Sequence, residues 1–421
     1  KKMSATGQCN SVILDGRYEV LRMIQKTASS QVVCCIDRQA PPHVSLPMVA
    51  VKILREDLSL LGVQEFDMLC KVQRSGGAEH CVQALGMFEH EKRKCLVLEL
   101  LGRSLAEACR EIIVQPKELQ SLSFCLTRHV DFLHRNGLLH ADIKPGNVCF
   151  DLARSSVKLL DLGNALEVAE TSLYFEDFEL QTFRYRAPEV FFGCRDFREP
   201  IDMWSMGLTL IEACAGRPLF ETSSPLELIK QWRAFYGSLP VSCFLHGKFV
   251  ETRLLNTRMA HLVHGRYEWN EADGMAPTLA QVELDAEDSH LDSDTDLDSE
   301  YDMESDCETN VGINQHDVCE DSFIFTMEGP WGDRTGLNHV QYSSLSVTAK
   351  GSPNVHMDSS SNTVETRLAQ SKAHLRYFLG WQDQEEAIDF LARLIAVNPD
   401  NRLSASEAFR HPFLAKCDVI H

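Results

Sequence analysis

The sequence predicts an α+β protein with two lobes, the first rich in strands and the second mainly helical, with a long acidic insertion in the second lobe. Three observations support this expectation. Residues 18–101 contain mostly short apolar runs typical of strands, with one helical pattern among them. Helical spacing dominates from Leu105 onward, and between residues 269 and 365 the composition turns polar and acidic before helical spacing resumes.

The strand signals of the first lobe are runs of alternating or continuous apolar residues bounded by turn residues. They lie at residues 18–24, 31–36, 48–54, 82–88 and 95–100. Between the third and fourth runs, Leu61, Phe66, Leu69 and Val72 recur at a spacing of three to five residues, which predicts a helix with Glu65 on its flank.

In the second lobe, residues 119–135 and 203–215 have the clearest helical patterns. We therefore expect a tail at residues 1–17, a first lobe at 18–101, a second lobe at 102–268 and 366–421, and the insertion at 269–365.

The composition excludes some classes of function. The chain has 421 residues with 41 Lys and Arg against 61 Asp and Glu, a net charge of −20, which argues against direct nucleic-acid binding through a basic surface. The most apolar stretch, residues 201–220, carries Asp202, Glu212 and Arg217, so we expect a buried helix and no membrane association. The N-terminus lacks the apolar region of a signal peptide.

The cysteines indicate a reducing compartment. All 15 are scattered without a repeated C-x-x-C spacing, which is typical of buried free thiols and argues against a zinc site. We expect an intracellular monomer, with nucleus and cytoplasm both open.

The insertion has the composition of a disordered segment. Thirteen acidic residues and no Lys or Arg lie between residues 283 and 308. It could be a solvated spacer, could bind basic partners, or could be phosphorylated by an acidophilic kinase, because five hydroxyl residues have an acidic residue three positions later: Ser289, Ser293, Thr295, Ser299 and Ser305. A calcium loop at residues 292–303 is disfavoured, because Leu297 replaces the required Gly and Met303 the required Glu.

The strongest chemical signal is the sequence HADIKPGN at residues 140–147, followed by DLG at residues 161–163. Phosphoryl transfer to a hydroxyl needs a carboxylate at the nucleophile, a cation at the phosphate and groups that hold metal ions. Asp142 can accept the hydroxyl proton, and Lys144 can neutralise the transferring phosphate if the segment is extended. Asn147 and Asp161 offer oxygen ligands suited to Mg²⁺.

These residues resemble the eukaryotic protein kinases, whose loop pattern is H-x-D-x-K-P-x-N followed by D-[FL]-G. The resemblance continues through VAVK at residues 49–52, APE at 187–189, DMWSMG at 202–207 and Asn401-Arg402, all in the kinase order. The sequence LVLELLG at residues 96–102 is similar to the hinge of dual-specificity tyrosine-regulated kinases (DYRK), and HAD to the homeodomain-interacting kinases (HIPK). Both belong to the CMGC group, which the YRAPEV sequence at residues 185–190 also matches.

The resemblance implies a bilobal kinase fold that uses ATP and Mg²⁺, with protein substrates. Catalytic roles fall on Asp142, Lys144, Asn147, Asp161, Lys52, Glu65 and Thr182, with Lys52 on the α/β-phosphates and paired with Glu65. Nucleotide contacts fall on Ile24, Val32, Ala50, Lys52, Leu98, Glu99 and Leu101, and metal contacts on Asn147 and Asp161. Glu189 with Arg402, and Asp202, are implied as structural anchors.

Thr182, in the sequence TFRYRAPE, is typical of serine/threonine kinases, with dual-specificity autophosphorylation still open.

One departure from the family pattern opens a second hypothesis. The glycine-rich loop G-x-G-x-x-G corresponds here to residues 25–30, where Gln25, Thr27 and Ser30 replace the glycines. If one of these positions requires a left-handed backbone, a non-glycine residue costs about 1–2 kcal/mol. The chain is therefore either an active kinase with an unusual nucleotide lid or a pseudokinase scaffold with weak or no turnover. Retention of the catalytic set favours the enzyme.

Regulation also differs from the common pattern. Ala141 stands where many kinases carry an Arg that binds a phosphorylated activation segment. Asp177 and Glu179 align with the activation tyrosines of DYRK kinases, so we expect them to order the segment through Arg184 or Arg186 without modification; Tyr174 is the alternative switch.

Overall fold

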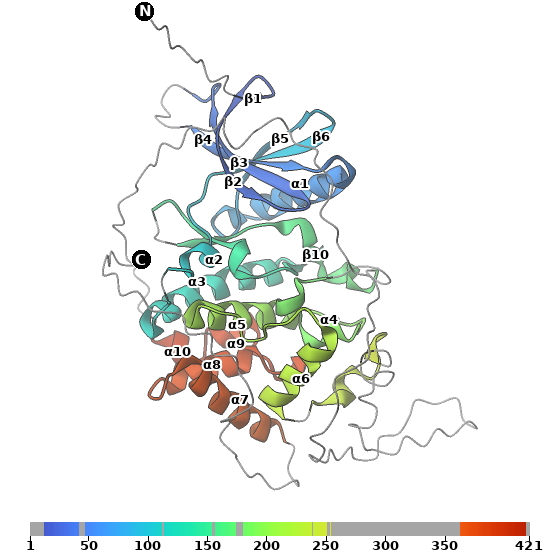
Figure 1. Cartoon of the computed structure of the whole chain (residues 1–421), viewed down its shortest axis with the longest axis vertical. Helices are drawn as coiled ribbons and strands as arrows, with labels where there is room; N and C mark the ends of the chain where they lie inside the picture. The colour runs from blue at the N-terminus through green and yellow to red at the C-terminus, as the bar shows by residue number, and fades with distance from the viewer. Residues whose placement is uncertain are drawn as a thin grey trace, which may run out of the picture. The chain divides into compact units, whose positions relative to one another are not determined.

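The computed structural model describes residues 12–41, 47–111, 113–153, 156–173, 180–237, 239–250, 253 and 363–417. Within this part the chain forms two compact units (Figure 1). The first contains the described residues up to Val63 together with Ala84–Leu100, and the second contains Gln64–Gln83 and the described residues from Leu101 onward. The predicted order, a strand-rich unit followed by a helical one, is confirmed.

The first unit is built on a six-stranded antiparallel sheet with the order β1-β2-β3-β4-β6-β5. Its strands are β1 (Ile13–Leu14), β2 (Tyr18–Lys26), β3 (Ser30–Asp37), β4 (Met48–Leu54), β5 (Ala84–His90) and β6 (Arg93–Glu99). The five predicted runs correspond to β2 through β6. Strand β1 has only two residues, too few for a periodic signal in the sequence.

Strand register separates the two faces of this sheet. Val33 pairs with Val51, and Val51 with Val97, so these side chains share one face, where they form a buried core with Leu14 and Tyr18. The residues one position along each strand therefore lie on the opposite face. That second face carries Val32, Ala50, Lys52 and Leu98 of the nucleotide prediction.

The second unit is mainly helical. Helix α1 (Ser59–Arg74), where the sequence predicts a helix, begins in the first unit and continues into the second. The other elements are α2 (Leu105–Ala108), α3 (Pro116–Arg135), β7 (Leu138–Leu139), β8 (Val148–Phe150), β9 (Val157–Leu159), β10 (Leu166–Glu167), α4 (Pro188–Phe191), α5 (Pro200–Ala215), α6 (Pro225–Tyr236), α7 (Val364–Leu379), α8 (Glu385–Leu394), α9 (Ala405–Ala408) and α10 (Pro412–Ala415).

Helix α5 is the central element of this unit, because nearly all of its side chains are buried. Trp204 is fully buried and packs against Phe220 and Trp232, with ring centroids 6.5 and 6.0 Å away. Gly207 lets the helix approach α8, since a Cβ there would lie 2.7 Å from a methyl carbon of Ile395. The buried helix predicted within residues 201–220 is confirmed for residues 201–215, and the left-handed Gly216 ends it.

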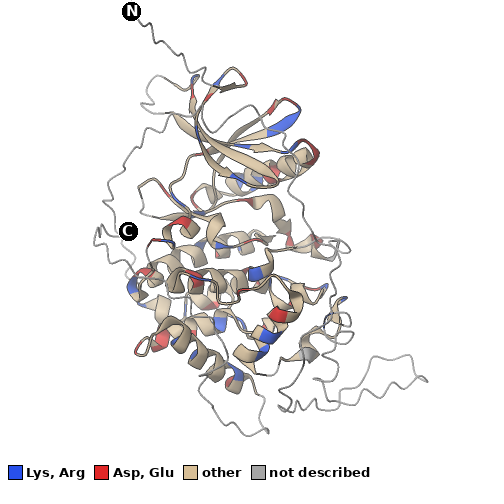
Figure 2. Cartoon of the chain, viewed as in Figure 1, with Lys and Arg blue, Asp and Glu red and all other residues tan. Residues whose placement is uncertain are grey.

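Each of the helices α6, α7 and α8 carries both acidic and basic residues, which Figure 2 colours red and blue. Many of them pair, such as Lys372 with Asp389 at 3.1 Å and Arg393 with Asp389 at 2.7 Å. No helix in the described ranges is long and apolar enough to span a membrane. Every cysteine of the described part is a free thiol.

Several expectations concern residues outside the described ranges. They include the acidic insertion up to residue 362, the hydroxyl residues within it, and Tyr174, Asp177 and Glu179. The chain is described again from Thr363, which caps α7 by accepting a hydrogen bond from the Thr366 backbone N–H. The tail and insertion boundaries stay predictions.

Glu189 and Arg402 form a buried ion pair that joins α4 to the chain after α8. Two hydrogen bonds of 2.5 and 2.6 Å link the guanidinium to the carboxylate, and both side chains are almost completely buried. Arg402 also donates to the Ala396, Val397 and Pro200 carbonyl oxygens. The guanidinium is therefore saturated with acceptors, so its charge is compensated in the interior.

We predict that Arg402→Met lowers the free energy of unfolding by about 3–5 kcal/mol, because it leaves the Glu189 carboxylate buried without its counter-ion. Urea denaturation measures this change. The exposed Lys416–Glu386 pair provides the control, and Lys416→Met should have little effect. Equal effects of the two variants would contradict the account.

Candidate active site

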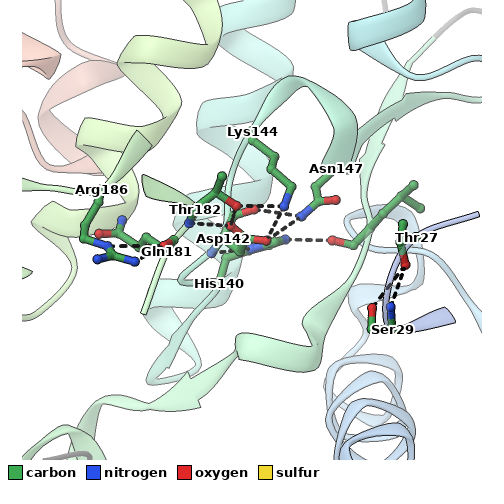
Figure 3. A network of polar contacts seen from close by, with 10 residues as sticks. Thr27, Ser29, His140, Asp142, Lys144, Asn147, Gln181, Thr182 and Arg186 are labelled. Carbon is green, nitrogen blue, oxygen red and sulfur yellow. Dashed lines mark hydrogen bonds and ion pairs between the residues drawn. The ribbon is translucent and has the colours of Figure 1, made fainter. Parts of the chain in front are cut away.

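The Asp142 carboxylate lies at the centre of a polar cluster in the second unit (Figure 3). Lys144 Nζ donates to Asp142 Oδ2 at 2.8 Å, and Asn147 Nδ2 donates to the same oxygen at 3.2 Å. Thr182 donates to Asp142 Oδ1 twice, from its hydroxyl at 2.7 Å and from its backbone N–H at 2.9 Å. Lys144 Nζ also donates to the Thr182 hydroxyl at 2.8 Å. The structure thus brings four of the predicted site residues together.

The backbone conformation of Lys144 explains its reach. Its φ of −159° and ψ of 163° are extended, as the predicted role of this lysine requires. Extended residues place side chains two positions apart on the same side of the chain. The ammonium of Lys144 therefore returns to the carboxylate of Asp142.

Asp202, on α5, holds the loop that carries Asp142. Its Oδ2 accepts hydrogen bonds from the His140 backbone N–H at 2.9 Å and from His134 Nε2 at 3.0 Å, and its Oδ1 accepts one from the Ala141 N–H at 2.9 Å. Burial alone raises the pKa of Asp202, but the His134 hydrogen bond and the nearby imidazoles outweigh it and the pKa is lowered. The buried carboxylate is thus retained as an anion that fixes two successive amides.

His140 links the same loop to the segment before Asp161. Its Nδ1 must accept, because the Asp142 backbone N–H donates to it at 3.2 Å. The proton therefore lies on Nε2, which donates to the Leu160 carbonyl at 3.0 Å. The histidine has a positioning role between Asp142 and Asp161, as its buried side chain and paired nitrogens require.

The predicted metal ligands, Asn147 and Asp161, offer the oxygens that Mg²⁺ prefers. Asn147 Nδ2 donates to the backbone carbonyl oxygen of Asp142 at 2.9 Å and to the Asp142 carboxylate. The side-chain oxygen of Asn147 therefore remains as an acceptor. A Cβ added at Gly163 would lie 3.2 Å from Asp161 Oδ1 and 3.9 Å from Glu65 Oε2, which places both carboxylates beside one glycine. The chemistry of this donor set fits a hard divalent cation.

Gln181 is a site residue that the sequence analysis missed. It is buried, and its side-chain amide donates to the Ile201 carbonyl at 3.0 Å and the Ser205 hydroxyl at 2.7 Å while accepting from the Ala187 N–H at 2.9 Å. Arg186 donates to the Gln181 carbonyl at 3.0 Å. Gln181 therefore attaches the segment around Thr182 to α5. Its position directly before Thr182 is the sole hint in the sequence.

Three residues of the site adopt the left-handed backbone conformation although none is glycine. Ala141, Asp161 and Gln181 have φ values of 59°, 59° and 63°. Each such residue costs about 1–2 kcal/mol, so the surrounding hydrogen bonds must hold it there. Strain concentrated at three points around one carboxylate indicates a site built for function.

In the first unit, four of the predicted nucleotide residues share the sheet face opposite the core. Val32 pairs with Lys52, and Ala50 pairs with Leu98, so these four side chains are neighbours on β3, β4 and β6. Ile24 lies at a register shift of β2 and is 38% exposed. Glu99 ends β6, and Leu101 belongs to the second unit. The pairing of Lys52 with Glu65 stays a prediction.

The β2–β3 turn, which replaces the glycine-rich loop, needs no left-handed residue. All its residues are described, and none of residues 25–30 has a positive φ. The Thr27 N–H donates to the Ser30 carbonyl at 2.9 Å, and the Thr27 hydroxyl oxygen accepts from the Ser29 and Ser30 N–H groups at 3.3 and 3.1 Å. Figure 3 shows the Thr27–Ser29 contact. The expected backbone penalty is therefore absent from this turn.

Arg55 holds the tip of the turn from outside. Its backbone N–H donates to the Ser29 carbonyl at 2.9 Å, and its guanidinium donates to the Ala28 carbonyl at 3.3 Å. Asp57 accepts two hydrogen bonds from the same guanidinium, at 2.5 and 2.8 Å. Arg55 thus fixes the tip of a turn in which the backbone amides of Thr27, Ser29 and Ser30 already donate within the turn.

This fold and this cluster are those of a protein kinase, and comparison with known families agrees. The pattern of the protein kinase domain family matches residues 18–249, more than half of the chain, so the chain belongs to this family. Members of the family typically use ATP and Mg²⁺.

Individual relatives lie in the CMGC group, as the sequence resemblance predicted. The human dual specificity protein kinase CLK1 is 29% identical over 293 residues, which cover 62% of this chain and 55% of that protein. Dual specificity tyrosine-phosphorylation-regulated kinase 3 of Rattus norvegicus is 32% identical over 216 residues, covering 48% and 34% of the two chains. The Caenorhabditis elegans kinase mbk-2 is also 32% identical over 216 residues, 25% of its length. The chain thus spans about half or less of the length of these relatives.

We predict that Asp202→Asn lowers the free energy of unfolding by about 2 kcal/mol at neutral pH, because the amide cannot accept hydrogen bonds at both former oxygens. The pKa of Asp202 is lowered from 3.8, so its contribution is complete above that pH and is lost as pH falls through the lower folded-state value.

Urea denaturation as a function of pH measures this effect. The difference between wild type and Asp202→Asn should shrink below about pH 4. A difference that grows in acid would contradict the assigned ionisation of Asp202.

Proposed function

We propose that this protein is an ATP- and Mg²⁺-dependent kinase that transfers the γ-phosphate to serine and threonine hydroxyls of protein substrates. The observation that carries the proposal is the Thr182 hydroxyl, which donates to Asp142 Oδ1 at 2.7 Å with the Lys144 ammonium 2.8 Å from the same hydroxyl oxygen. One hydroxyl is thus held between a carboxylate and a cation. A substrate hydroxyl needs the same two partners.

Asp142 is the proposed base. A carboxylate that accepts a hydroxyl hydrogen bond at this distance can orient the oxygen for attack and receive its proton as the new bond to phosphorus forms. Lys144 stabilises negative charge on the transferring group, because its ammonium reaches both the carboxylate and the hydroxyl. Lys52 is proposed to position the α/β-phosphates.

Asn147 and Asp161 would hold Mg²⁺, and the bound ion would neutralise charge on the phosphates of ATP. The chain contributes the orientation of both ligands. Asn147 is fixed by its two hydrogen bonds to Asp142, and Asp161 follows Leu160, whose carbonyl accepts from His140. One loop thereby sets the proposed base and both proposed metal ligands.

The β2–β3 turn favours the second candidate, a kinase-shaped scaffold with little turnover. Kinases cover the phosphates with a glycine-rich loop. Here the Ser29 and Ser30 amides donate to the Thr27 hydroxyl, and Arg55 holds the tip. These contacts reduce the number of backbone amides that the turn can offer to the phosphates of a nucleotide. They remove no group around Asp142, so we favour an active enzyme that binds ATP weakly.

Serine and threonine are proposed as acceptors because Thr182 contacts Asp142 and Lys144. The relatives CLK1 and tyrosine-phosphorylation-regulated kinase 3 are both named as dual-specificity kinases. Tyrosine autophosphorylation therefore belongs to the same proposal.

We predict that Asp142→Asn lowers the rate of phosphoryl transfer by a factor on the order of 10²–10⁴, because the amide cannot accept the proton. Transfer from labelled ATP to a mixed peptide substrate measures the rate, and calorimetry should show unchanged ATP binding. Asp131→Asn is the matched control, because Asp131 is a carboxylate of α3 that pairs with Arg135. Wild-type turnover in Asp142→Asn would refute the assigned base.

We predict that glycines at Gln25, Thr27 and Ser30 together tighten ATP binding by about tenfold, because the turn then loses its internal hydroxyl acceptor and can follow the phosphates. Thr27→Val separates the loss of the hydroxyl acceptor from the added backbone flexibility. It removes the acceptor of the Ser29 and Ser30 amides without adding flexibility. Unchanged or weaker binding by both variants would show that the present turn already makes favourable contacts with the nucleotide.

A further inference from the structure

The C-terminal side of α4 is held by a segment that lies far from it in sequence. Residues 247–250 together with 253, here called the strap, run along Phe192 and Gly193, directly after the helix. The Lys248 N–H donates to the Gly193 carbonyl at 3.1 Å, and the Phe249 N–H donates to the Phe192 carbonyl at 2.9 Å. The strap is therefore joined to the end of α4 by its backbone.

Two glycines allow this close approach. A Cβ at Gly247 would lie 2.3 Å from the Phe192 carbonyl oxygen, and a Cβ at Gly193 would lie 2.7 Å from the Phe249 ring. Gly193 also has a φ of +76°. A side chain at either glycine would therefore prevent the strap from packing against the end of α4.

Arg253 adds a side-chain clamp to the backbone contact. Its guanidinium donates to the Phe191 carbonyl and lies 4.3 Å from the centroid of the Phe191 ring and 4.6 Å from that of Phe249. A cation close to two aromatic rings and bonded to a carbonyl acceptor interacts strongly in a site partly removed from water. Phe191 itself is fully buried.

From Phe191 the contacts lead to the proposed catalytic residues. The Phe183 ring packs edge-on against Phe191, with centroids 6.2 Å apart, and Arg186 lies 5.8 Å from the Phe183 centroid. Phe183 directly follows Thr182, which contacts Asp142. The Glu189–Arg402 pair holds α4 from a separate direction.

We propose that Arg253 is a positioning residue that, with the strap, sets the placement of Phe183 and Thr182 and thereby the binding of the peptide substrate. The effect on substrate binding rests on the proposed kinase activity, whereas the anchoring of α4 does not. The strap acts as a second anchor for the segment that ends in α4, independent of the Glu189–Arg402 pair.

The experiment compares Arg253→Ala, Arg253→Lys and Arg217→Ala in the full chain. Arg217 is the matched control, because its guanidinium lies 4.2 Å from the centroid of the Phe378 ring, away from α4. Hydrogen exchange reports on the amides of Phe191, Phe192 and Cys194, each of which donates at 2.8 Å to a carbonyl at or just before α4. Steady-state kinetics gives separate KM values for peptide and ATP.

We expect Arg253→Ala to speed exchange of these three amides about tenfold and to raise the peptide KM by about five- to tenfold, with the ATP KM unchanged. Arg253→Lys should be intermediate, because it keeps the charge and loses the planar guanidinium. Arg217→Ala should match wild type in both measurements.

Unchanged exchange in Arg253→Ala would overturn the anchor, as would an equal change in Arg217→Ala or a rise spread evenly over the second unit. Faster exchange with an unchanged peptide KM would overturn the positioning role. If wild type transfers no phosphate, the kinase proposal fails, and the exchange data still decide whether Arg253 anchors α4.

Discussion

The buried carboxylate of Asp202 is the interaction on which the proposed active site depends. It lies on α5, the most completely buried helix of the second unit, and accepts the backbone amides of His140 and Ala141. Ala141 has a left-handed backbone that would not persist without such support. Asp142, the next residue, is thereby presented to Lys144, Asn147 and Thr182. The buried helix α5 thus fixes the loop that carries Asp142 through the single carboxylate of Asp202.

The same helix fixes the segment on the other side of Asp142. Ile201 and Ser205 of α5 accept the side-chain amide of Gln181, which places Thr182 against the carboxylate. Two strained positions therefore depend on one rigid element, and the distance between them is set by α5. This arrangement explains how a site with unfavourable local backbone can still be rigid.

The sequence was sufficient to predict the features that depend on local residue patterns. The strands β2 through β6 and helices α1, α3 and α5 follow from apolar spacing, and the protein kinase family follows from the loop around Asp142 together with its companion motifs. The buried pair of Glu189 and Arg402 also came from that resemblance, and the structure contains it.

What the sequence could not predict depends on contacts between distant residues or on local side-chain geometry. Gln181 has no motif of its own, and its role comes from Ile201 and Ser205, which lie 20 and 24 residues away. Arg253 reaches the Phe191 carbonyl across 62 residues. The loss of glycines at residues 25–30 was evident, yet their replacement by a hydroxyl-closed turn depends on the rotamer of Thr27.

The central claim is that the proposed catalytic residues around Asp142 support phosphoryl transfer although the β2–β3 turn contributes little to nucleotide binding. The most direct test is the initial rate of peptide phosphorylation by wild type as a function of ATP concentration, extended well above 1 mM, with EDTA as the metal-free control. The account predicts Mg²⁺-dependent transfer that saturates only at about 1 mM ATP or higher, with an ordinary turnover number once saturated. Transfer that is absent at every ATP concentration would contradict it.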